Sequence, residues 1–332
     1  MRLRILSLAA VLIATNFFPA RAKTPEYAPP SPSRQVASIE LTWHDAARDR
    51  DVPVKIYYPA HGKGPFPVII FSHGLGGSRE GYGYLGEYWA GCGYVSVHLQ
   101  HHGSDDAVWR DAGGLIAAAK AMQDSVKDVS NAINRAQDVS FAIDELAKME
   151  KDSDSPLKGR LNLARIGMSG HSFGGWTTTA IAGETFGAGR PALGDPRVKA
   201  AVAMSAPVPP LADRKGAFDT IKIPIFYMTG TLDDSPIGET KASERRIPFD
   251  GTSHAETCLV IFKGADHMAF SGHVVPRDSD AGYQRLICIA SEAFWDAYLK
   301  DDPGAKQWLY NGGFTKLLDG KGTFEVKMPA GK

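Results

Sequence analysis

Residues 170–174 read Gly-His-Ser-Phe-Gly, a G-x-S-x-G pattern that places Ser172 between two glycines. The apolar run 163–168 predicts a buried strand before it, and the small residues of 174–181 predict a helix after it. A chain that passes from strand to helix so abruptly strains its central residue, and the glycines let neighbouring backbone come close. The pattern therefore predicts an exposed nucleophilic serine beside a helix N-terminus, whose free N–H groups favour negative charge. An ordinary turn rich in glycine and serine is the alternative.

A serine hydroxyl needs a base to take its proton, and that base needs a third group to orient it. The apolar run 223–229 is followed by Gly-Thr-Leu-Asp-Asp, which offers Asp233 or Asp234 as the acid. The run 258–262 is followed by Lys-Gly-Ala-Asp-His, which offers His267 as the base. Because both loops follow predicted strands in the chain order serine, acid, histidine, we expect them to meet Ser172 at one edge of a sheet. Each would otherwise be a solvated loop residue.

Backbone N–H groups are well suited to stabilise the oxyanion that forms when a serine attacks a carbonyl carbon. We expect one such donor at Phe173, directly after the nucleophile. The second is expected at Leu75, in the glycine-rich loop 72–77 with the sequence Ser-His-Gly-Leu-Gly-Gly. A tight glycine turn without a binding role is the alternative for this loop.

Three motifs together resemble the serine α/β-hydrolases. They are Phe-Ser-His-Gly-Leu-Gly-Gly at 71–77, Gly-His-Ser-Phe-Gly-Gly at 170–175 and Gly-Ala-Asp-His-Met at 264–268. The resemblance covers most of residues 50–300 and is strongest to the platelet-activating-factor acetylhydrolase and dienelactone-hydrolase-like esterases. It implies a Ser–His–Asp esterase of the α/β-hydrolase fold, acting on small or short-acyl esters, with Leu75 and Phe173 as oxyanion donors. In such hydrolases the acid commonly stands three residues after the glycine that follows the strand, which implies Asp233.

The resemblance leaves several substrates and one non-enzymatic function to be considered. The chain carries Ser172 where dienelactone hydrolases carry cysteine, and secreted polyester hydrolases share the fold and the serine motif. A polymer ester is therefore a further candidate substrate, and an amidase or peptidase would use the same triad. A catalytically silent binding protein could also keep the fold. Residues 206–222 are short, rich in proline and charge, and carry no long apolar helical pattern, which favours small esters over long lipids.

The loop 100–106, Gln-His-His-Gly-Ser-Asp-Asp, follows another predicted strand at the same edge. We expect it to line the substrate site through His101. A metal cluster formed by His101, His102, Asp105 and Asp106 is the alternative, but serine hydrolysis needs no metal, and we predict neither a metal nor a cofactor.

Several apolar side chains could form a pocket for the acyl or alcohol group of an ester. We expect Trp109 and Met268 to touch substrate, and Tyr82, Tyr84 and Phe270 are further candidates. Most aromatic residues belong to a core, so this remains the alternative for each of them.

Strands alternating with helices must position these groups, and this alternation predicts an α/β fold with a mostly parallel central sheet and helices on both faces. The expected strands are 36–43 and 54–58, forming a hairpin, then 67–72, 94–99, 163–168, 198–205, 223–229 and 257–262. The expected helices are 80–90, 125–149, 174–181 and 282–300, whereas 303–332 shows no firm pattern. We expect residues 36–332 to form a single domain.

The N-terminus has a basic start, a short apolar run and Ala-Arg-Ala at 20–22, which together predict a secretory signal peptide at 1–22. A proline-containing segment at 23–35 predicts a flexible leader, and the protein is expected to be secreted or periplasmic without a stable membrane anchor. The 37 basic and 37 acidic residues balance, which gives no reason to expect nucleic acid as a partner. The expected partner is a small-molecule ester.

The chain has three cysteines in a protein expected to reach an oxidising compartment. Cys258 opens the last predicted strand and Cys288 lies on the C-terminal helix that should pack nearby, so we predict a disulfide between them. Cys92 is then expected to be a free thiol.

Overall fold

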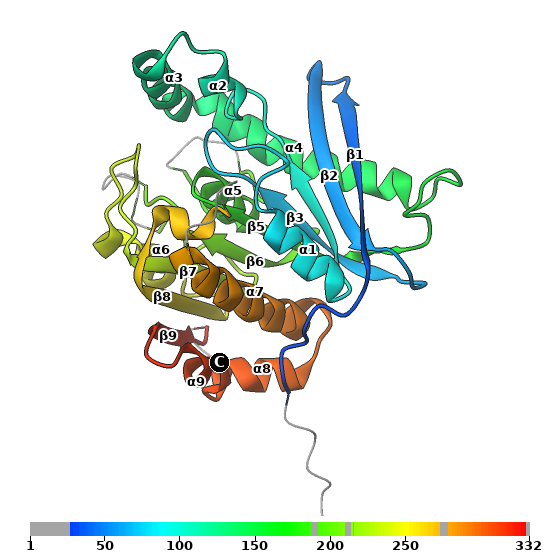
Figure 1. The fold of residues 1–332 in the computed structure, drawn as a ribbon, viewed down its shortest axis with the longest axis vertical. Helices are drawn as coiled ribbons and strands as arrows, with labels where there is room; N and C mark the ends of the chain where they lie inside the picture. Colours follow the sequence, from blue (N-terminus) through cyan, green and yellow to red (C-terminus); the bar gives the residue numbers. More distant parts are fainter. Residues whose placement is uncertain (1–26, 187–191, 210–213, 215, 273–277, 330–332) are drawn as a thin grey trace, which may run out of the picture.

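A nine-stranded sheet forms the centre of the computed structural model, which describes residues 27–186, 192–209, 214, 216–272 and 278–329 (Figure 1). The strand order is β1-β2-β4-β3-β5-β6-β7-β8-β9. Its inner six strands are parallel: β4 (Val95–Leu99), β3 (Phe66–Ser72), β5 (Leu161–His171), β6 (Val198–Met204), β7 (Ile225–Leu232) and β8 (Thr257–Asp266). All six therefore end at the same edge of the sheet, where the loops with the candidate catalytic residues begin.

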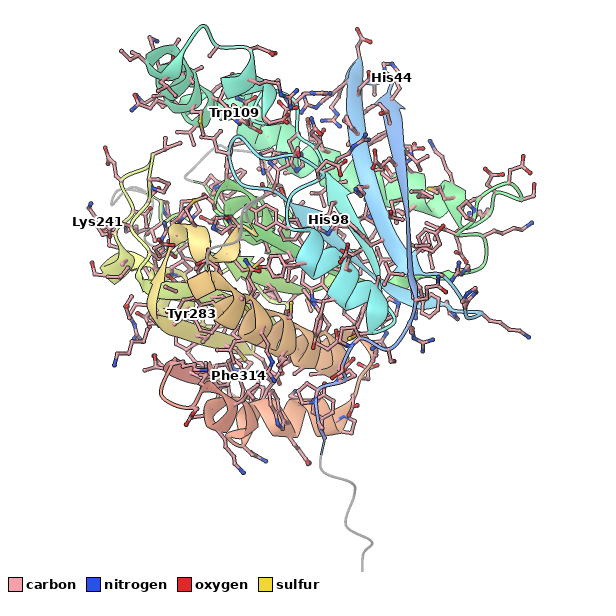
Figure 2. All side chains as sticks on the ribbon, in the orientation of Figure 1. His44, His98, Trp109, Lys241, Tyr283 and Phe314 are labelled. Carbon is pink, nitrogen blue, oxygen red and sulfur yellow. The ribbon has the colours of Figure 1, made fainter. Side chains whose placement is uncertain are left out.

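Antiparallel strands complete both sides of the sheet. The hairpin of β1 (Val36–Asp45) and β2 (Arg50–Pro59) pairs with β4, and β9 (Gly322–Lys327) pairs with β8. Residues 303–332, which show no firm pattern in the sequence, supply β9 together with α8 (Pro303–Tyr310) and α9 (Gly313–Leu318). Phe314 of α9 anchors this C-terminal unit, because its ring packs edge-on against Phe324 of β9 and Phe226 of β7 (Figure 2).

Helices cover both faces of the sheet, and the alternation of side chains along β3 shows how. Ile69 and Phe71 belong to a core shared with α1 (Gly83–Gly91) and α7 (Asp278–Leu299). Val68 and Ile70 point the other way, into a core shared with α4 (Val129–Met149) and α5 (Phe173–Ala182). A strand covered on both faces can be apolar throughout, which is why residues 67–72 form a continuous apolar run. The predicted α/β-hydrolase fold class is confirmed.

The segment between β4 and α4 differs from the expectation. The single helix predicted at 125–149 is interrupted, because Asp128 leaves helical geometry and its side chain caps α4 by accepting from the N–H of Ser130. Two further helices precede it, α2 (Ala107–Arg110) and α3 (Leu115–Lys127), and they stand out from the body of the protein (Figure 1). Leu115 and Ile116 at the start of α3 are exposed, and Ser125 is the one residue of this helix that is buried, so α3 packs little against the rest of the protein.

The predicted leader also differs from the structure over its described part. Tyr27 donates its hydroxyl to Asp296 on α7, and Pro30 accepts a hydrogen bond from the Tyr88 hydroxyl on α1. Residues 27–35 therefore pack along the protein. The signal peptide predicted at 1–22 lies outside the described residues, and within the described ones no helix has the length and apolar character needed to cross a membrane.

The predicted disulfide between Cys258 and Cys288 is wrong, because all three cysteines are free thiols in the structure. Cys258 is the second residue of β8 and lies close to Tyr298, near the C-terminal end of α7. Cys288 is ten residues earlier on the same helix, about 15 Å along its axis at the usual rise per residue. The helix does pack on the sheet as expected, but it runs in the direction that separates the two sulfur atoms.

Candidate active site

Ser172 occupies a sharp bend between β5 and α5, with φ of 56° and ψ of −117°. A non-glycine residue rarely adopts a positive φ, so the fold holds this serine in a strained conformation. The bend, residues 172–174, which we call the elbow, also lies against β3: a Cβ atom on Gly174 would lie 1.8 Å from the backbone oxygen of Ser72. The glycine at 174 is therefore required by a close backbone contact.

His267 and Asp233 lie in line with Ser172 at the carboxyl edge of the sheet. The Ser172 hydroxyl is 2.9 Å from His267 Nε2, and His267 Nδ1 is 2.7 Å from Asp233 Oδ1. A carboxylate only accepts, so Nδ1 carries the proton and Nε2 is left to accept from the serine. Asp233 follows β7, and His267 begins the short 3-10 helix η3 (His267–Phe270) after β8. The arrangement can transfer a proton from serine to imidazole beside a buried negative charge.

The neighbouring aspartates have different environments. Asp233 is fully buried, whereas Asp234 is exposed and turns away. Asp234 accepts from the backbone N–H of Ala242 and pairs with Lys241, at the start of η2 (Ala242–Glu244). The structure thus brings Asp233, and not Asp234, to the imidazole.

Asp233 is held by two groups besides His267. Thr229 donates its hydroxyl to Asp233 Oδ2 at 2.7 Å, and Arg245 Nη2 lies 3.3 Å from Oδ1. Burial opposes ionisation, but the hydrogen bond from His267 and the charge of Arg245 outweigh it and keep the pKa of Asp233 below its ordinary value. The carboxylate is therefore charged at neutral pH.

No pattern in the sequence predicts a functional role for Arg245, although it is one of the most buried cations in the described chain. Its guanidinium donates to the backbone oxygens of Ser205, Ala206 and Asp233 at 2.7, 2.9 and 3.0 Å. These contacts fasten the loop with the acid to the end of β6. In the sequence it stands in the run Ser-Glu-Arg-Arg, which looks like an ordinary charged surface.

The loop 72–77 and the start of α5 face each other beside Ser172. Within the described residues, the backbone N–H groups of Leu75 and Phe173 have no acceptor, whereas Gly76 donates to Ser104 and Gly77 donates to Gly74. Phe173 is the first residue of α5, where the helix dipole favours negative charge. Both N–H groups are thus available to a ligand oxygen.

A second missed feature is the hydrogen-bonded pair of His171 and Tyr82. His171 Nε2 donates to the backbone oxygen of His267 at 2.9 Å, and its Nδ1 accepts from the Tyr82 hydroxyl at 2.8 Å. Burial holds the pKa of His171 well below its usual range, with the His267 ring adding to the effect. A neutral His171 therefore holds the backbone of His267 in place through this hydrogen bond.

Two of the residues expected to line the substrate site, Trp109 and Met268, are partly exposed. Trp109, on α2, is 45% exposed and donates its indole N–H to the backbone oxygen of Gly76 in the loop 72–77 (Figure 2). Met268 is half-buried directly after His267. These two positions are compatible with contact to a bound substrate.

His101 corrects the expectation for the loop 100–106, because it is fully buried and faces the interior. Its Nδ1 bonds to Asp138 and its Nε2 to Ser72, so the side chain supports the fold beneath the loop 72–77. Tyr82 and Phe270 are also buried in the core, and Tyr84 is half-buried with its hydroxyl bonded to the backbone of Phe270.

The acidic side chains of the loop 100–106 have protein partners. Asp105 accepts from Gln100 and His102, and Asp106 pairs with Arg110. In the described ranges, no group of three or more histidine, cysteine, aspartate or glutamate side chains is arranged to hold a metal ion.

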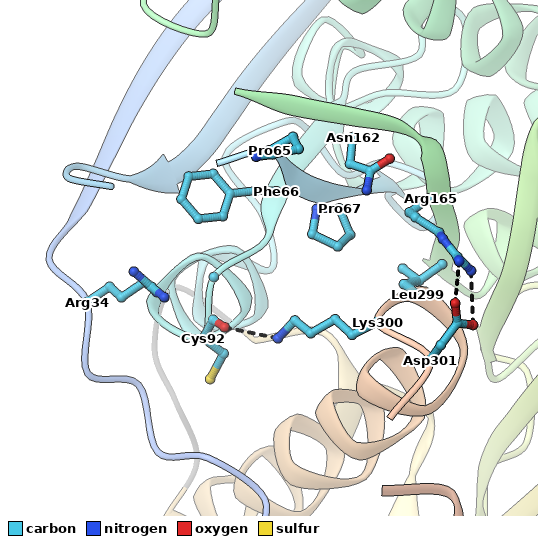
Figure 3. Close-up of a pocket in the computed structure, with 11 residues that line it drawn as sticks. Arg34, Pro65, Phe66, Pro67, Cys92, Asn162, Arg165, Leu299, Lys300 and Asp301 are labelled. Carbon is cyan, nitrogen blue, oxygen red and sulfur yellow. Dashed lines mark hydrogen bonds and ion pairs between the residues drawn. The ribbon is translucent and has the colours of Figure 1, made fainter. Parts of the chain in front are cut away.

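A hollow of about 530 Å³ lies away from Ser172, at the opposite ends of the strands (Figure 3). It is lined by residues at the starts of β3 and β5, Phe66 and Asn162 among them, and by the ion pair of Arg165 with Asp301. Its position separates it from the candidate catalytic groups.

Comparison with known proteins gives the same family that the motifs indicated. The family model described as "Platelet-activating factor acetylhydrolase, isoform II" matches residues 34–112. Proteins named "Platelet-activating factor acetylhydrolase" from Cavia porcellus and Canis lupus familiaris are each 24% identical to the chain, over 77% and 66% of its length. The one from Bos taurus is 21% identical over 66%.

The matched regions span 63% of the Cavia porcellus relative and 51% of the other two, so the chain corresponds to about half to two thirds of each. The fold and the matches together confirm the resemblance predicted from the three motifs: the chain is similar to the serine α/β-hydrolases of the platelet-activating factor acetylhydrolase group.

Proposed function

We propose that the protein is a serine hydrolase of carboxylic esters. The observation that carries this proposal is the continuous hydrogen-bonded line from Ser172 through His267 to Asp233, with the serine in the strained bend before α5. The relatives named as acetylhydrolases support hydrolysis as the activity.

The proposed reaction is acyl transfer through the serine. Ser172 Oγ attacks the ester carbonyl carbon while His267 Nε2 takes the hydroxyl proton, and Asp233 stabilises the resulting imidazolium. The N–H groups of Leu75 and Phe173 stabilise the oxyanion. The tetrahedral intermediate then collapses, the proton passes from His267 to the departing alcohol, and an acyl-enzyme remains. Water that loses a proton to His267 releases the acid and restores the serine.

The proposed substrates are small or short-acyl esters. The relatives are named for removal of an acetyl group, which is a short acyl chain. The described residues of the segment 206–222 contain no helix that would cover a long apolar trench. We also propose that the protein is secreted or periplasmic, on the basis of the signal-peptide pattern at 1–22.

The test is a panel of p-nitrophenyl esters of rising acyl length, together with an anilide, a polyester film and emulsified triglyceride. We expect the acetate and butyrate esters to be hydrolysed fastest. Rates on triglyceride equal to those on butyrate would contradict the short-acyl proposal, and faster release from the anilide would favour an amidase.

Ser172→Ala is the matching variant, and it should lower turnover by about 10⁴- to 10⁶-fold while the protein stays folded. A fluorophosphonate probe should label the native protein and leave the variant unlabelled. A variant that kept a tenth of the native rate would show that Ser172 is not the nucleophile, and an unlabelled native protein would favour a silent binding protein.

A further inference from the structure

Beneath the loop 72–77 the structure contains a second Ser–His–Asp array. Ser72 donates its hydroxyl to His101 Nε2 at 2.8 Å, and His101 Nδ1 donates to Asp138 Oδ2 at 2.9 Å. The distances resemble those between Ser172, His267 and Asp233. All three side chains of the second array are buried, however, and Ser72 has no exposed surface through which a substrate could reach it. The array of Ser72, His101 and Asp138 can therefore act only through the protein groups that it contacts.

Arg135 of α4 is the group that links this array to both candidate oxyanion donors. Its Nη2 donates to Ser72 Oγ at 3.1 Å and to the backbone oxygen of His73, in the loop with Leu75. Its Nε donates to Thr177 Oγ1 at 3.1 Å, on the helix that begins at Phe173. The guanidinium carbon lies 4.5 Å from the centre of the Phe173 ring.

A further hydrogen bond of Arg135 reaches the same loop indirectly. Nη1 donates to Ser104 Oγ at 2.8 Å, and the backbone oxygen of Ser104 accepts the N–H of Gly76 at 2.9 Å. The guanidinium of Arg135 therefore contacts three segments. These are residues 72–73 just before Leu75, Ser104 in the loop 100–106, and the helix that begins at Phe173.

The charge of Arg135 makes this placement costly. Arg135 is fully buried, and among the described residues no carboxylate lies within ion-pair distance of it. Asp138, one turn later on α4, is already paired with Arg48, Arg50 and His101. Burial lowers the pKa of Arg135 to about 9, although the charge of Asp138 opposes this. A buried cation without a direct counter-ion destabilises a fold, so a purely structural role would be served better by an apolar side chain.

We propose that Arg135 is a positioning residue of the oxyanion hole, which holds the N–H groups of Leu75 and Phe173 at a fixed separation. This inference rests on the proposed esterase function. Arg135 itself does not touch the substrate and acts through His73, Ser104, Thr177 and Phe173. A lysine at this place would keep the charge, but its single ammonium cannot span acceptors that a guanidinium reaches in several directions.

The test compares Arg135→Lys and Arg135→Met with the native protein on p-nitrophenyl butyrate. A displacement of about 1 Å at a reacting group can cost about 10²-fold in rate, so we expect Arg135→Met to lower kcat by about that factor. Arg135→Lys should give an intermediate loss. KM should stay within about threefold, because oxyanion donors act mainly on the transition state.

Butylboronic acid provides a readout that a merely structural role would not move. Its boron accepts the oxygen of Ser172 as a fourth ligand while the proton passes to His267, which gives an anionic tetrahedral adduct. We expect its inhibition constant to rise by the same factor by which kcat falls. The pH at which the rate reaches half its maximum should not change, because the contacts of His267 are intact.

Leu146→Ala, on the same helix and outside this network, is the matched control for lost stability. It should lower Tm and leave kcat and boronate binding unchanged. If the Arg135 variants fail to fold, Thr177→Val carries the test, because it removes the acceptor on α5 with little change of shape. It should lower kcat and boronate affinity together, by about threefold to tenfold, since the acceptor of Arg135 Nε is lost along with the bond that the same hydroxyl donates to the backbone oxygen of Phe173.

Native kcat and native boronate affinity in both Arg135→Lys and Thr177→Val would overturn the inference. So would a loss of kcat without weaker boronate binding. Failure of the proposed function is a separate outcome, because the native protein would then neither hydrolyse the ester nor react with the fluorophosphonate.

Discussion

Two adjacent aspartates follow β7, and the chemistry of the site depends on which one meets His267. Asp233 Oδ1 lies 2.7 Å from the imidazole, while Asp234 bonds to the start of η2. A base in a triad must be held in one tautomer, and only a partner at Nδ1 can do this. In the proposed reaction, Asp233 therefore orients His267 and Asp234 does not.

We expect Asp233→Asn to lower turnover by about 10⁴-fold, because an amide no longer fixes the tautomer of His267. Asp234→Asn is the matched control and should retain most of the activity, since its side chain is exposed. Turnover of p-nitrophenyl butyrate by the two purified variants measures the difference. The reverse ranking would identify Asp234 as the acid, and two mild effects would leave the proposed triad without one.

The residues found from the sequence are those whose role depends on a local pattern. Ser172 is marked by its flanking glycines, and His267 by its place after an apolar run. Arg135, Arg245 and the pair of Tyr82 with His171 depend on contacts between distant segments, which no local pattern encodes. His101 was misplaced for the same reason: its loop is at the expected edge, but Asp138 of α4 draws its side chain inward.

At the scale of elements, the sequence predicts those that are buried. The parallel strands are continuous apolar runs because helices cover both faces. The hairpin, α1, α5 and α7 also lie near the expected positions. Among the missed elements, α2, α9 and β9 are too short to show a periodic apolar pattern, whereas α3 carries apolar residues that stay largely exposed.

The elbow between β5 and α5 is the element with the least room for change. Gly174→Ala would place a methyl group 1.8 Å from the backbone oxygen of Ser72, and backbone cannot move aside as a side chain can. We expect a destabilisation of about 1–3 kcal/mol and a large loss of activity, because β3 and Ser172 must separate. Urea unfolding and turnover measure the two effects.

Gly282→Ala is the control, because nothing lies within 4 Å of a Cβ atom at that position of α7. It should stabilise the protein by about 0.5–1 kcal/mol, since alanine favours a helix. Equal effects of the two substitutions would show that the close contact at Gly174 is not required.

For the whole molecule, buried titratable groups make the free energy of unfolding depend on pH, and histidines and carboxyl groups act in opposite directions. His73, His98, His101 and His171 are buried and neutral. Burial lowers the pKa of His98 and His101 to about 4 and that of His73 and His171 well below the ordinary 6.5. Burial acts oppositely on two carboxyl groups: it raises the pKa of Glu184 to about 8 and that of Glu292 well above its usual range.

The sign of each effect follows from which state binds more protons. Below pH 6.5 the unfolded chain protonates histidines that stay neutral in the native state, so stability falls as the pH falls from 6.5 toward 4. The two glutamates hold protons in the native state that the unfolded chain loses above 4.5, so they lower stability as the pH rises toward 8. They offset part of the histidine effect below 6.5 and continue to lower stability above it.

The expected result is a maximum of the free energy of unfolding near pH 6.5, with a decline on both sides of roughly 1.4 kcal/mol per pH unit for each net proton exchanged. Half-buried His102, whose pKa is raised by its hydrogen bond with Asp105, adds to the alkaline decline, because the native state keeps a proton that the unfolded chain loses above pH 6.5. Urea unfolding at pH 5, 6.5 and 8.5 measures the curve.

Glu184→Gln separates the two sides of this curve. Its amide keeps the hydrogen bond with Thr179 but has no proton to lose, so the decline between pH 6.5 and 8.5 should become shallower. The acidic side should become steeper, because the variant lacks one of the two carboxyl groups that offset the histidines there. Stability that is constant from pH 5 to 8.5 in the native protein, or an alkaline decline unchanged by Glu184→Gln, would contradict the assignment of these groups as neutral in the folded state.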